Sequence, residues 1–150
     1  MKRFHVNVTV ENLQQSTLFY ETLFGEKATV TKDDYAKWML EDPRINFSIT
    51  ESEKSHGINH VGLQVESEDE LAEIQSRLDQ AGEKTIQQPE AECCYAKSSK
   101  TWVRDPDDVA WETFVTHDQT THYGNDLVPG LTPGTAAPKK AADTTTRCCA

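Results

Sequence analysis

The stretch HVNVTV at residues 5–10 returns as HVGLQV at residues 60–65, and a histidine leads both copies. Apolar residues fill every second position after each histidine, a pattern typical of a strand with one buried face. Further along, the tripeptide GEK at residues 25–27 returns at residues 82–84, at nearly the same spacing. Two matches at similar separations, 55 and 57 residues, indicate that the chain carries an internal duplication.

An amphipathic helix is predicted after the first strand of each copy. In the second copy, Ser67 and Glu70 have the spacing of a capping box, and Gly82 suits the left-handed residue that follows a helix. In the first copy, Asn12 offers the cap, together with Gln15, and Gly25 the end. The inward helix faces, which favour packing on a sheet, are predicted to carry Leu13, Thr17, Tyr20 and Phe24 in the first copy and Leu71, Ile74, Leu78 and Ala81 in the second.

Three extended runs follow each helix. They are predicted at residues 27–31, 35–40 and 45–50 in the first copy and at residues 83–87, 93–98 and 109–115 in the second. Each copy therefore has the order β-α-β-β-β. The sequence predicts an α+β fold, in which two tandem βαβββ modules form a cupped mixed sheet with helices on its apolar face and a cavity on its polar face.

The duplication also predicts the domain organisation. Residues 1–123 are expected to form one domain, with module one at residues 1–52 and module two at residues 57–123. Residues 124–150 are rich in proline, glycine, alanine and threonine and contain no aromatic residue. This composition predicts a flexible tail, which ends in a pair of cysteines.

Composition narrows the classes of partner. The chain of 150 residues has a formal net charge of −10, which opposes binding to the phosphates of nucleic acid. Its first ten residues alternate polar and apolar side chains, unlike a signal peptide, and no run reaches the length of a membrane span. We therefore expect a cytoplasmic protein whose cysteines are kept as free thiols.

Four inward positions of the duplicated unit converge on a predicted metal site. Aligning Phe47 with Trp111 places Ser48 at the position of Glu112, and His5 already matches His60. Two imidazoles and one carboxylate are typical of non-haem Fe(II) enzymes that bind O2 and substrate together. Zinc is the competing metal for the same three ligands. We predict that His5, His60 and Glu112 bind the metal and that Ser48 leaves the fourth position vacant.

All four cysteines occur as two adjacent pairs, Cys93-Cys94 and Cys148-Cys149. Neighbouring Cα atoms are ~3.8 Å apart, whereas a relaxed disulfide needs ~4.4–6.8 Å. The spacing of a structural zinc site is also missing. The pairs are therefore either small apolar fillers or chelators for one soft, thiol-seeking atom.

Several motifs resemble the vicinal oxygen chelate superfamily, which includes glyoxalase I, fosfomycin-resistance proteins and extradiol dioxygenases. The resemblance spans residues 1–123 and includes the two histidines and the segment RDPDDVAWE at residues 104–112. Many members carry glycine where Asp108 stands, which leaves the turn plausible. Within the superfamily, the stretch CCYAK at residues 93–97, the segment TWVRDPD at 101–107, WETF at 111–114 and HYG at 122–124 look like the ArsI carbon–arsenic lyases, also called CadI-like proteins.

The resemblance implies Fe(II)- and O2-dependent cleavage of the carbon–arsenic bond of trivalent organoarsenicals, such as methylarsenite, to inorganic arsenite. It implies that His5, His60 and Glu112 hold iron and that Cys93 and Cys94 bind arsenic. We hypothesise that Cys148 and Cys149 deliver the arsenical, because a flexible tail of this length spans roughly 25–30 Å. His117 and His122 are predicted to follow the last strand.

Two other classes of function stay open. The four thiols also suit a non-catalytic protein that binds cadmium or arsenite, although such a protein does not need the His5-His60-Glu112 set. The fold also suits another metal-dependent superfamily member, such as a glyoxalase or thiol transferase, which would generally fill the position of Ser48 with a carboxylate. The expected partner is a small molecule, and the cup could be completed within one chain or between two, as a monomer or homodimer.

Overall fold

The computed structural model describes residues 1–93 and 95–119 of the chain. The first half of the described chain contains β1 (Arg3–Val10), α1 (Leu13–Phe24), β2 (Val30–Thr31), β3 (Tyr35–Glu41) and β4 (Arg44–Glu51). The second half contains β5 (Gly57–Val65), α2 (Glu68–Gln80), β6 (Ile86–Cys93), β7 (Ala96–Arg104) and β8 (Ala110–Gln119). Both halves thus have the order β-α-β-β-β, as the duplication predicts.

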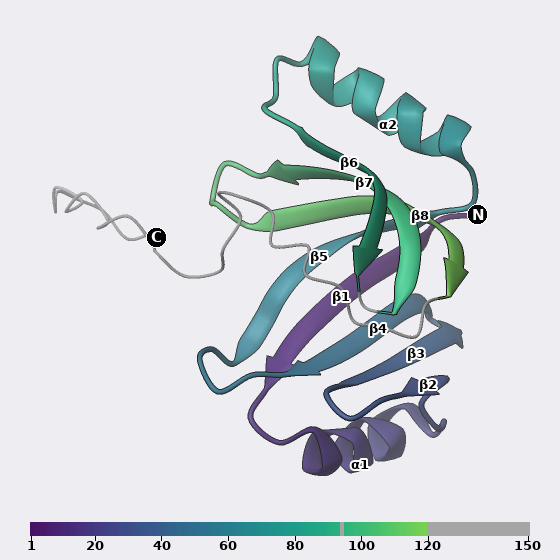
Figure 1. Ribbon diagram of the computed structural model, residues 1–150, viewed down its shortest axis with the longest axis vertical. Helices are drawn as coiled ribbons and strands as arrows, with labels where there is room; N and C mark the ends of the chain where they lie inside the picture. The colour runs from purple at the N-terminus through teal and green to yellow at the C-terminus, as the bar shows by residue number, and fades with distance from the viewer. Residues whose placement is uncertain (94, 120–150) are drawn as a thin grey trace, which may run out of the picture.

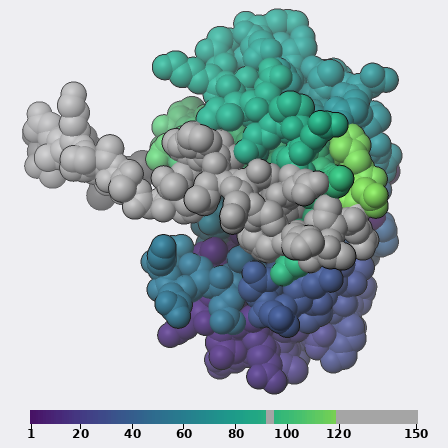
Figure 2. Space-filling view, viewed as in Figure 1, coloured from purple at the N-terminus to yellow at the C-terminus, as the bar shows by residue number. Residues whose placement is uncertain are grey.

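All eight of these strands form one mixed sheet in the order β2-β3-β4-β1-β5-β8-β7-β6. The first strand of each half pairs in parallel with the last strand of the same half, β1 with β4 and β5 with β8. The two halves meet where β1 and β5 pair antiparallel at the centre of the sheet. Figure 1 shows the strongly curved sheet with α1 and α2 at its two ends, and Figure 2 shows the two halves stacked one on the other.

Both helices begin and end at residues that the sequence indicates. The side chain of Asn12 accepts a hydrogen bond from the Gln15 amide, and Ser67 accepts one from the Glu70 amide. The left-handed residue after α1 is Gly25, with φ of 69°. No helix in residues 1–93 and 95–119 is long and apolar enough to cross a membrane.

The hydrophobic core lies between the helices and the convex face of the sheet. Under α1, Trp38 and Ile49 are fully buried, and the rings of Tyr20, Phe24 and Phe47 pack around them. Under α2, the buried cluster contains Val65, Leu71, Ile74 and Val115. Because alternate strand residues point to opposite faces, this packing directs the polar residues of the same strands to the concave face.

The strand prediction for module two is wrong between residues 93 and 98. β6 continues to Cys93 and β7 begins at Ala96, so the predicted single strand is the junction of two strands. β6 passes through Pro89 with a register shift between Gln88 and Ala91, and β6 is the edge strand of the sheet. Proline lacks an amide donor and is tolerated at such an edge, so β6 stays extended through Pro89.

Candidate metal centre

Alternate residues of the central strands line the concave face, here called the cup face. His5 lies beside Asn46 of β4 and Gly62 of β5. Gly62 lies in turn beside Glu112 of β8. His60 of β5 lies beside Asn7 of β1, two residues along these antiparallel strands from the pair His5 and Gly62. The central strand pair and its neighbour β8 therefore present His5, His60 and Glu112 on one surface.

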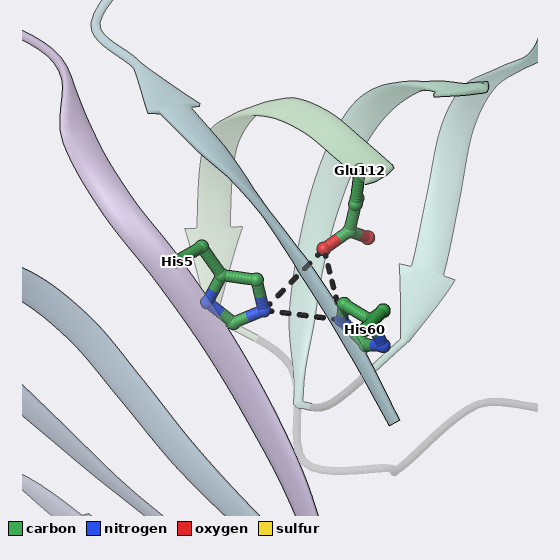
Figure 3. Close-up of side chains that lie close together, drawn as sticks. All are labelled: His5, His60 and Glu112. Carbon is green, nitrogen blue, oxygen red and sulfur yellow. Dashed lines mark hydrogen bonds and ion pairs between the residues drawn. The ribbon is translucent and has the colours of Figure 1, made fainter. Parts of the chain in front are cut away.

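The three side chains meet in a compact triangle of ligand atoms (Figure 3). The Nε2 atoms of His5 and His60 are 3.1 Å apart. The Oε2 atom of Glu112 is 3.5 Å from Nε2 of His5 and 3.4 Å from Nε2 of His60. Among the described residues, these are the one group of three His, Cys, Asp or Glu side chains arranged to hold a metal ion.

The hydrogen bonds of the two histidine Nδ1 atoms favour tautomers whose Nε2 lone pairs point into the triangle. Nδ1 of His5 is 3.0 Å from the carbonyl oxygen of Asn46, which can only accept, so this nitrogen carries the proton. Nδ1 of His60 is 2.7 Å from Oδ1 of Asn59 and donates in the same way. In the neutral form of each imidazole, the Nε2 lone pair then points towards the other ring and towards the Glu112 carboxylate. A cation at the centre of the triangle removes this repulsion.

The size of the triangle fits such a cation. A bond of about 2.1 Å from metal to nitrogen or oxygen places neighbouring ligand atoms roughly 3.0 Å apart in an octahedron and roughly 3.4 Å apart in a tetrahedron. The observed separations of 3.1, 3.4 and 3.5 Å lie within about 0.1 Å of one or the other of these values. The donor set of two imidazoles and one carboxylate suits iron or zinc.

Burial and the neighbouring charges favour the metal-binding forms of two of the three side chains. Burial lowers the pKa of His5 to about 4, although the nearby Glu112 carboxylate opposes this shift. Burial also opposes ionisation of Glu112, but the Lys100 ammonium and both imidazoles hold its pKa well below the usual range. At neutral pH, His5 is therefore neutral and Glu112 is ionised.

Ser48 occupies the position in module one that corresponds to Glu112. It lies beside Asn7 in the β1–β4 pair, as Glu112 lies beside Gly62 in the β5–β8 pair. Its side chain is fully buried and accepts a hydrogen bond of 2.8 Å from Nδ2 of Asn7. The duplicated frame therefore carries a short hydroxyl where module two carries a carboxylate.

Sequence reasoning missed three side chains around the triangle. Nζ of Lys100 is 2.7 Å from Oε1 of Glu112. The ring of Trp102 meets that of His60 edge to face at 5.1 Å, and the ring of Phe114 meets that of His5 in the same way at 5.1 Å. Alternation along β7 places Lys100 and Trp102 on the cup face, but this signal requires knowing that the strand runs to Arg104.

The predicted cysteine ligands lie largely beyond what the structure describes. The backbone of Cys93 ends β6 and pairs with Ala96 of β7. Cys94, Cys148 and Cys149 lie outside the described residues, as does His122. Tyr95, which follows Cys94 in the chain, is described: its hydroxyl donates to Oδ1 of Asp34 at 2.8 Å.

Of the remaining histidines, two are described and both lie away from the triangle. Nε2 of His56 is 2.9 Å from the carbonyl oxygen of Ser52 at the surface. The prediction that His117 follows the last strand is wrong, because β8 runs to Gln119. His117 contacts Glu68 at 2.8 Å and Ser99 at 3.0 Å.

Comparison with known proteins agrees with this fold. The family model of the Glyoxalase/Bleomycin resistance protein/Dioxygenase superfamily matches residues 2–113. The solved structure of an extradiol ring-cleaving dioxygenase from B.fuscum superposes with a TM-score of 0.60 and 14% identity, over 77% of this chain and 32% of that one. At this identity, the structural likeness concerns the fold alone.

Two sequence relatives are more similar. A protein of Bacillus subtilis (strain 168), named "Probable trivalent organoarsenical cleaving enzyme", is 42% identical over 118 residues, which are 77% of this chain and 81% of the relative. The "Trivalent organoarsenical cleaving enzyme" of Bacillus sp. (strain MD1) is 38% identical over 129 residues, covering 81% of this chain and 80% of the relative. The chain therefore belongs to the glyoxalase/bleomycin resistance protein/dioxygenase superfamily, and within it to the same family as these two Bacillus proteins.

Proposed function

We propose that this chain is an Fe(II)- and O2-dependent carbon–arsenic lyase that converts trivalent organoarsenicals, such as methylarsenite, to inorganic arsenite. The observation that carries the proposal is the convergence of three lone-pair atoms, from His5, His60 and Glu112, within 3.5 Å of one another. The names of the two Bacillus relatives support the class of substrate.

The ligand set favours iron chemistry over a closed metal site. His5, His60 and Glu112 would hold the ion from one side, which leaves positions for exogenous ligands on the other. Ser48 supplies no carboxylate at the fourth symmetric position. Bound ferrous iron would supply the activation of O2, and the protein would supply placement.

Residues behind the triangle orient the ligands. The carbonyl oxygen of Asn46 and the side-chain oxygen of Asn59 each accept a hydrogen bond from a histidine Nδ1, which directs both Nε2 atoms to one point. Such partners fix the tautomer and the ring orientation of metal-binding histidines. The Trp102 and Phe114 rings support the two imidazoles edge-on.

Cys93 and Cys94 are proposed to bind the arsenic atom. Methylarsenous acid has two hydroxyl groups on arsenic, so two thiols can replace both, release two water molecules and leave the methyl group attached. Both chain neighbours of Cys94 have fixed partners: Cys93 pairs with Ala96 in the sheet, and Tyr95 is anchored at Asp34. Holding substrate beside the metal centre would convert a rare encounter into an effectively intramolecular one.

Arsenite release tests the proposal directly. Purified protein is loaded with Fe(II) under anaerobic conditions, mixed with methylarsenite, and divided into aerobic and anaerobic portions, and inorganic arsenite is quantified. We expect release that requires O2 and that is lost in Glu112→Ala and in Cys94→Ser. Glu73→Ala, which removes an exposed carboxylate on α2, serves as the matched control and should keep full activity.

Two results would contradict the proposal. Binding of methylarsenite without release under every condition would instead support a thiol-based binding protein for arsenite or cadmium. Release that is equal with Zn(II) and without O2 would support metal-assisted hydrolysis rather than oxygen chemistry.

A further inference from the structure

The two carboxylate oxygens of Glu112 face different partners. Oε2 points to the two histidine Nε2 atoms, at 3.5 and 3.4 Å. Oε1 accepts a hydrogen bond from Nζ of Lys100 at 2.7 Å. Both residues are buried, with Lys100 7% exposed and Glu112 3% exposed. Oε2 of the carboxylate thus faces the triangle, whereas Oε1 binds a buried ammonium group.

Aromatic rings hold the ammonium group in place. Nζ of Lys100 lies 5.9 Å from the centre of the Trp102 ring and 6.0 Å from that of Phe114. A cation over such rings is attracted to their faces. The same two rings contact His60 and His5. The position of Lys100 is therefore coupled to both histidines as well as to Glu112.

We propose that Lys100 is a positioning residue that makes Glu112 a one-oxygen metal ligand; this inference rests on the proposed metal centre. A carboxylate can bind a metal ion through one oxygen or through both. The charge-assisted hydrogen bond to Lys100 withholds Oε1 from the ion. Glu112 then occupies one coordination position rather than two, which leaves an additional position for O2 or substrate.

The alternative is that Lys100 only neutralises a buried charge and stabilises the fold. A buried carboxylate without a partner is strongly destabilising, so this role would also keep a lysine beside Glu112. The two roles differ in how the carboxylate binds the ion. Only the positioning role predicts that removing Lys100 changes the coordination of Glu112 while the metal remains bound.

Infrared spectroscopy of the Co(II)-loaded protein distinguishes the two roles. The separation between the antisymmetric and symmetric carboxylate stretches is wider for one-oxygen than for two-oxygen binding. A difference spectrum between metal-free and Co(II)-loaded protein, assigned with Glu112→Gln, should show the wider separation in the wild type. The wild-type measurement needs no lysine variant, and the narrower separation there would overturn the proposal.

Lys100→Met is the decisive variant, because methionine fills a similar volume between the two rings without charge. We expect the carboxylate separation to narrow and Co(II) to bind about tenfold more tightly, since a nearby positive charge is lost. Lys100→Arg keeps a charged donor and should retain the wild-type separation. Lys84→Met, at an exposed site, is the matched control and should change neither quantity.

The possible results distinguish failure of the proposed role of Lys100 from failure of the proposed metal centre. An unchanged carboxylate separation in Co(II)-loaded Lys100→Met would overturn the positioning role, whatever happens to affinity. If that variant does not fold, the wild-type and Lys100→Arg spectra still decide the coordination mode. If wild-type protein takes up no Co(II), or takes it up equally in His60→Ala, the metal centre itself is wrong and the inference fails with it.

Discussion

The hydroxyl of Tyr95 donates to Oδ1 of Asp34 at 2.8 Å and so connects the two opposite edges of the sheet. Asp34 lies in the turn between β2 and β3, and Tyr95 lies between β6 and β7. Tyr95 also packs on the Tyr35 ring at 5.9 Å and under Nζ of Lys32 at 5.1 Å. Its backbone has φ of 63°, a conformation that costs a non-glycine residue roughly 1–2 kcal/mol. These contacts offset that cost.

Replacing Tyr95 by phenylalanine should loosen this connection without removing the ring. Loss of one hydrogen bond is worth about 0.5–1.5 kcal/mol, so backbone amides at residues 32–37 and 95–98 should exchange with deuterium up to about tenfold faster. Tyr20→Phe, whose ring packs in the core beneath α1, is the control and should leave exchange at both segments unchanged. Equal exchange in Tyr95→Phe and the wild type would show that the hydroxyl contact does not hold the edges together.

Gly62 should tolerate no side chain. A Cβ atom at this position would lie 1.9 Å from the backbone oxygen of Glu112. We expect Gly62→Ala to lower the free energy of unfolding by about 1–3 kcal/mol or more and to weaken Co(II) binding, because the strand that carries Glu112 must move. Urea denaturation and metal titration measure the two effects.

The control for Gly62→Ala is Gly25→Ala, at the end of α1. A Cβ atom there meets nothing within 4 Å, but φ is 69°. The expected loss of stability is roughly 1 kcal/mol from backbone strain, with unchanged Co(II) affinity. Similar loss of metal binding in both variants would contradict a local effect at Glu112.

The stability of the metal-free protein should depend on pH through His5. The pKa of His5 falls from 6.5 to about 4 on folding. Between these values the unfolded chain binds more protons than the folded one, so the free energy of unfolding decreases as pH falls from 6.5 towards 4. The maximum effect is about 3 kcal/mol. Above pH 6.5, this contribution is fully present.

Urea titrations of chelator-treated protein between pH 7.5 and pH 5 measure this dependence. This range lies above the ordinary pKa of the Glu112 carboxyl, 4.5, so the slope reports chiefly on histidine. His5→Gln should flatten the slope, whereas His56→Gln, at an exposed site, should not. If the slope persists in His5→Gln, groups other than His5 cause the pH dependence of stability.

A carboxylate at position 48 should close the metal site. Ser48 corresponds to Glu112 by sheet register. Ser48→Glu should add a fourth protein ligand and tighten Co(II) binding, while it lowers O2-dependent arsenite release at least tenfold, because an exogenous position is filled. Ser48→Gln has the same shape without the charge, and tighter metal binding by both variants would rule out a ligand effect.

The C-terminal cysteines supply a prediction that concerns residues outside the described part of the chain. If Cys148 and Cys149 deliver arsenical, a chain truncated after Pro138 should keep its turnover at saturating methylarsenite and lose efficiency when methylarsenite is scarce. The full-length Cys148→Ser/Cys149→Ser variant should behave in the same way. Unchanged kinetics at low substrate in both variants would contradict delivery.

Much of the cup face can be predicted from the sequence because its signal is local. Alternation along residues 5–10 and 60–65 separates polar from apolar faces, and the duplication brings His5, His60 and Glu112 to related positions. The register of β1 with β4 and of β5 with β8 agrees with the alignment of Ser48 and Glu112. These inferences need only the period of a strand and the repeat.

The remaining features depend on contacts that no local pattern encodes. The predicted strand at residues 83–87 is too short, because the edge strand β6 continues through Pro89 with a register shift. Lys100 is missed because β7 is longer than predicted, and an isolated lysine usually lies at the surface. The contact of Tyr95 with Asp34 requires the sheet to curve until its edges meet.

The antiparallel seam between β1 and β5 has a consequence for the history of the chain. Two identical βαβββ units that assembled as separate molecules around such a seam would have to carry the same residue at both copies of every position. Joining the units in one polypeptide releases this constraint. Position 48 can then keep a hydroxyl while position 112 keeps a carboxylate, so that the two halves supply unequal sets of side chains to the triangle, His5 from one and His60 with Glu112 from the other.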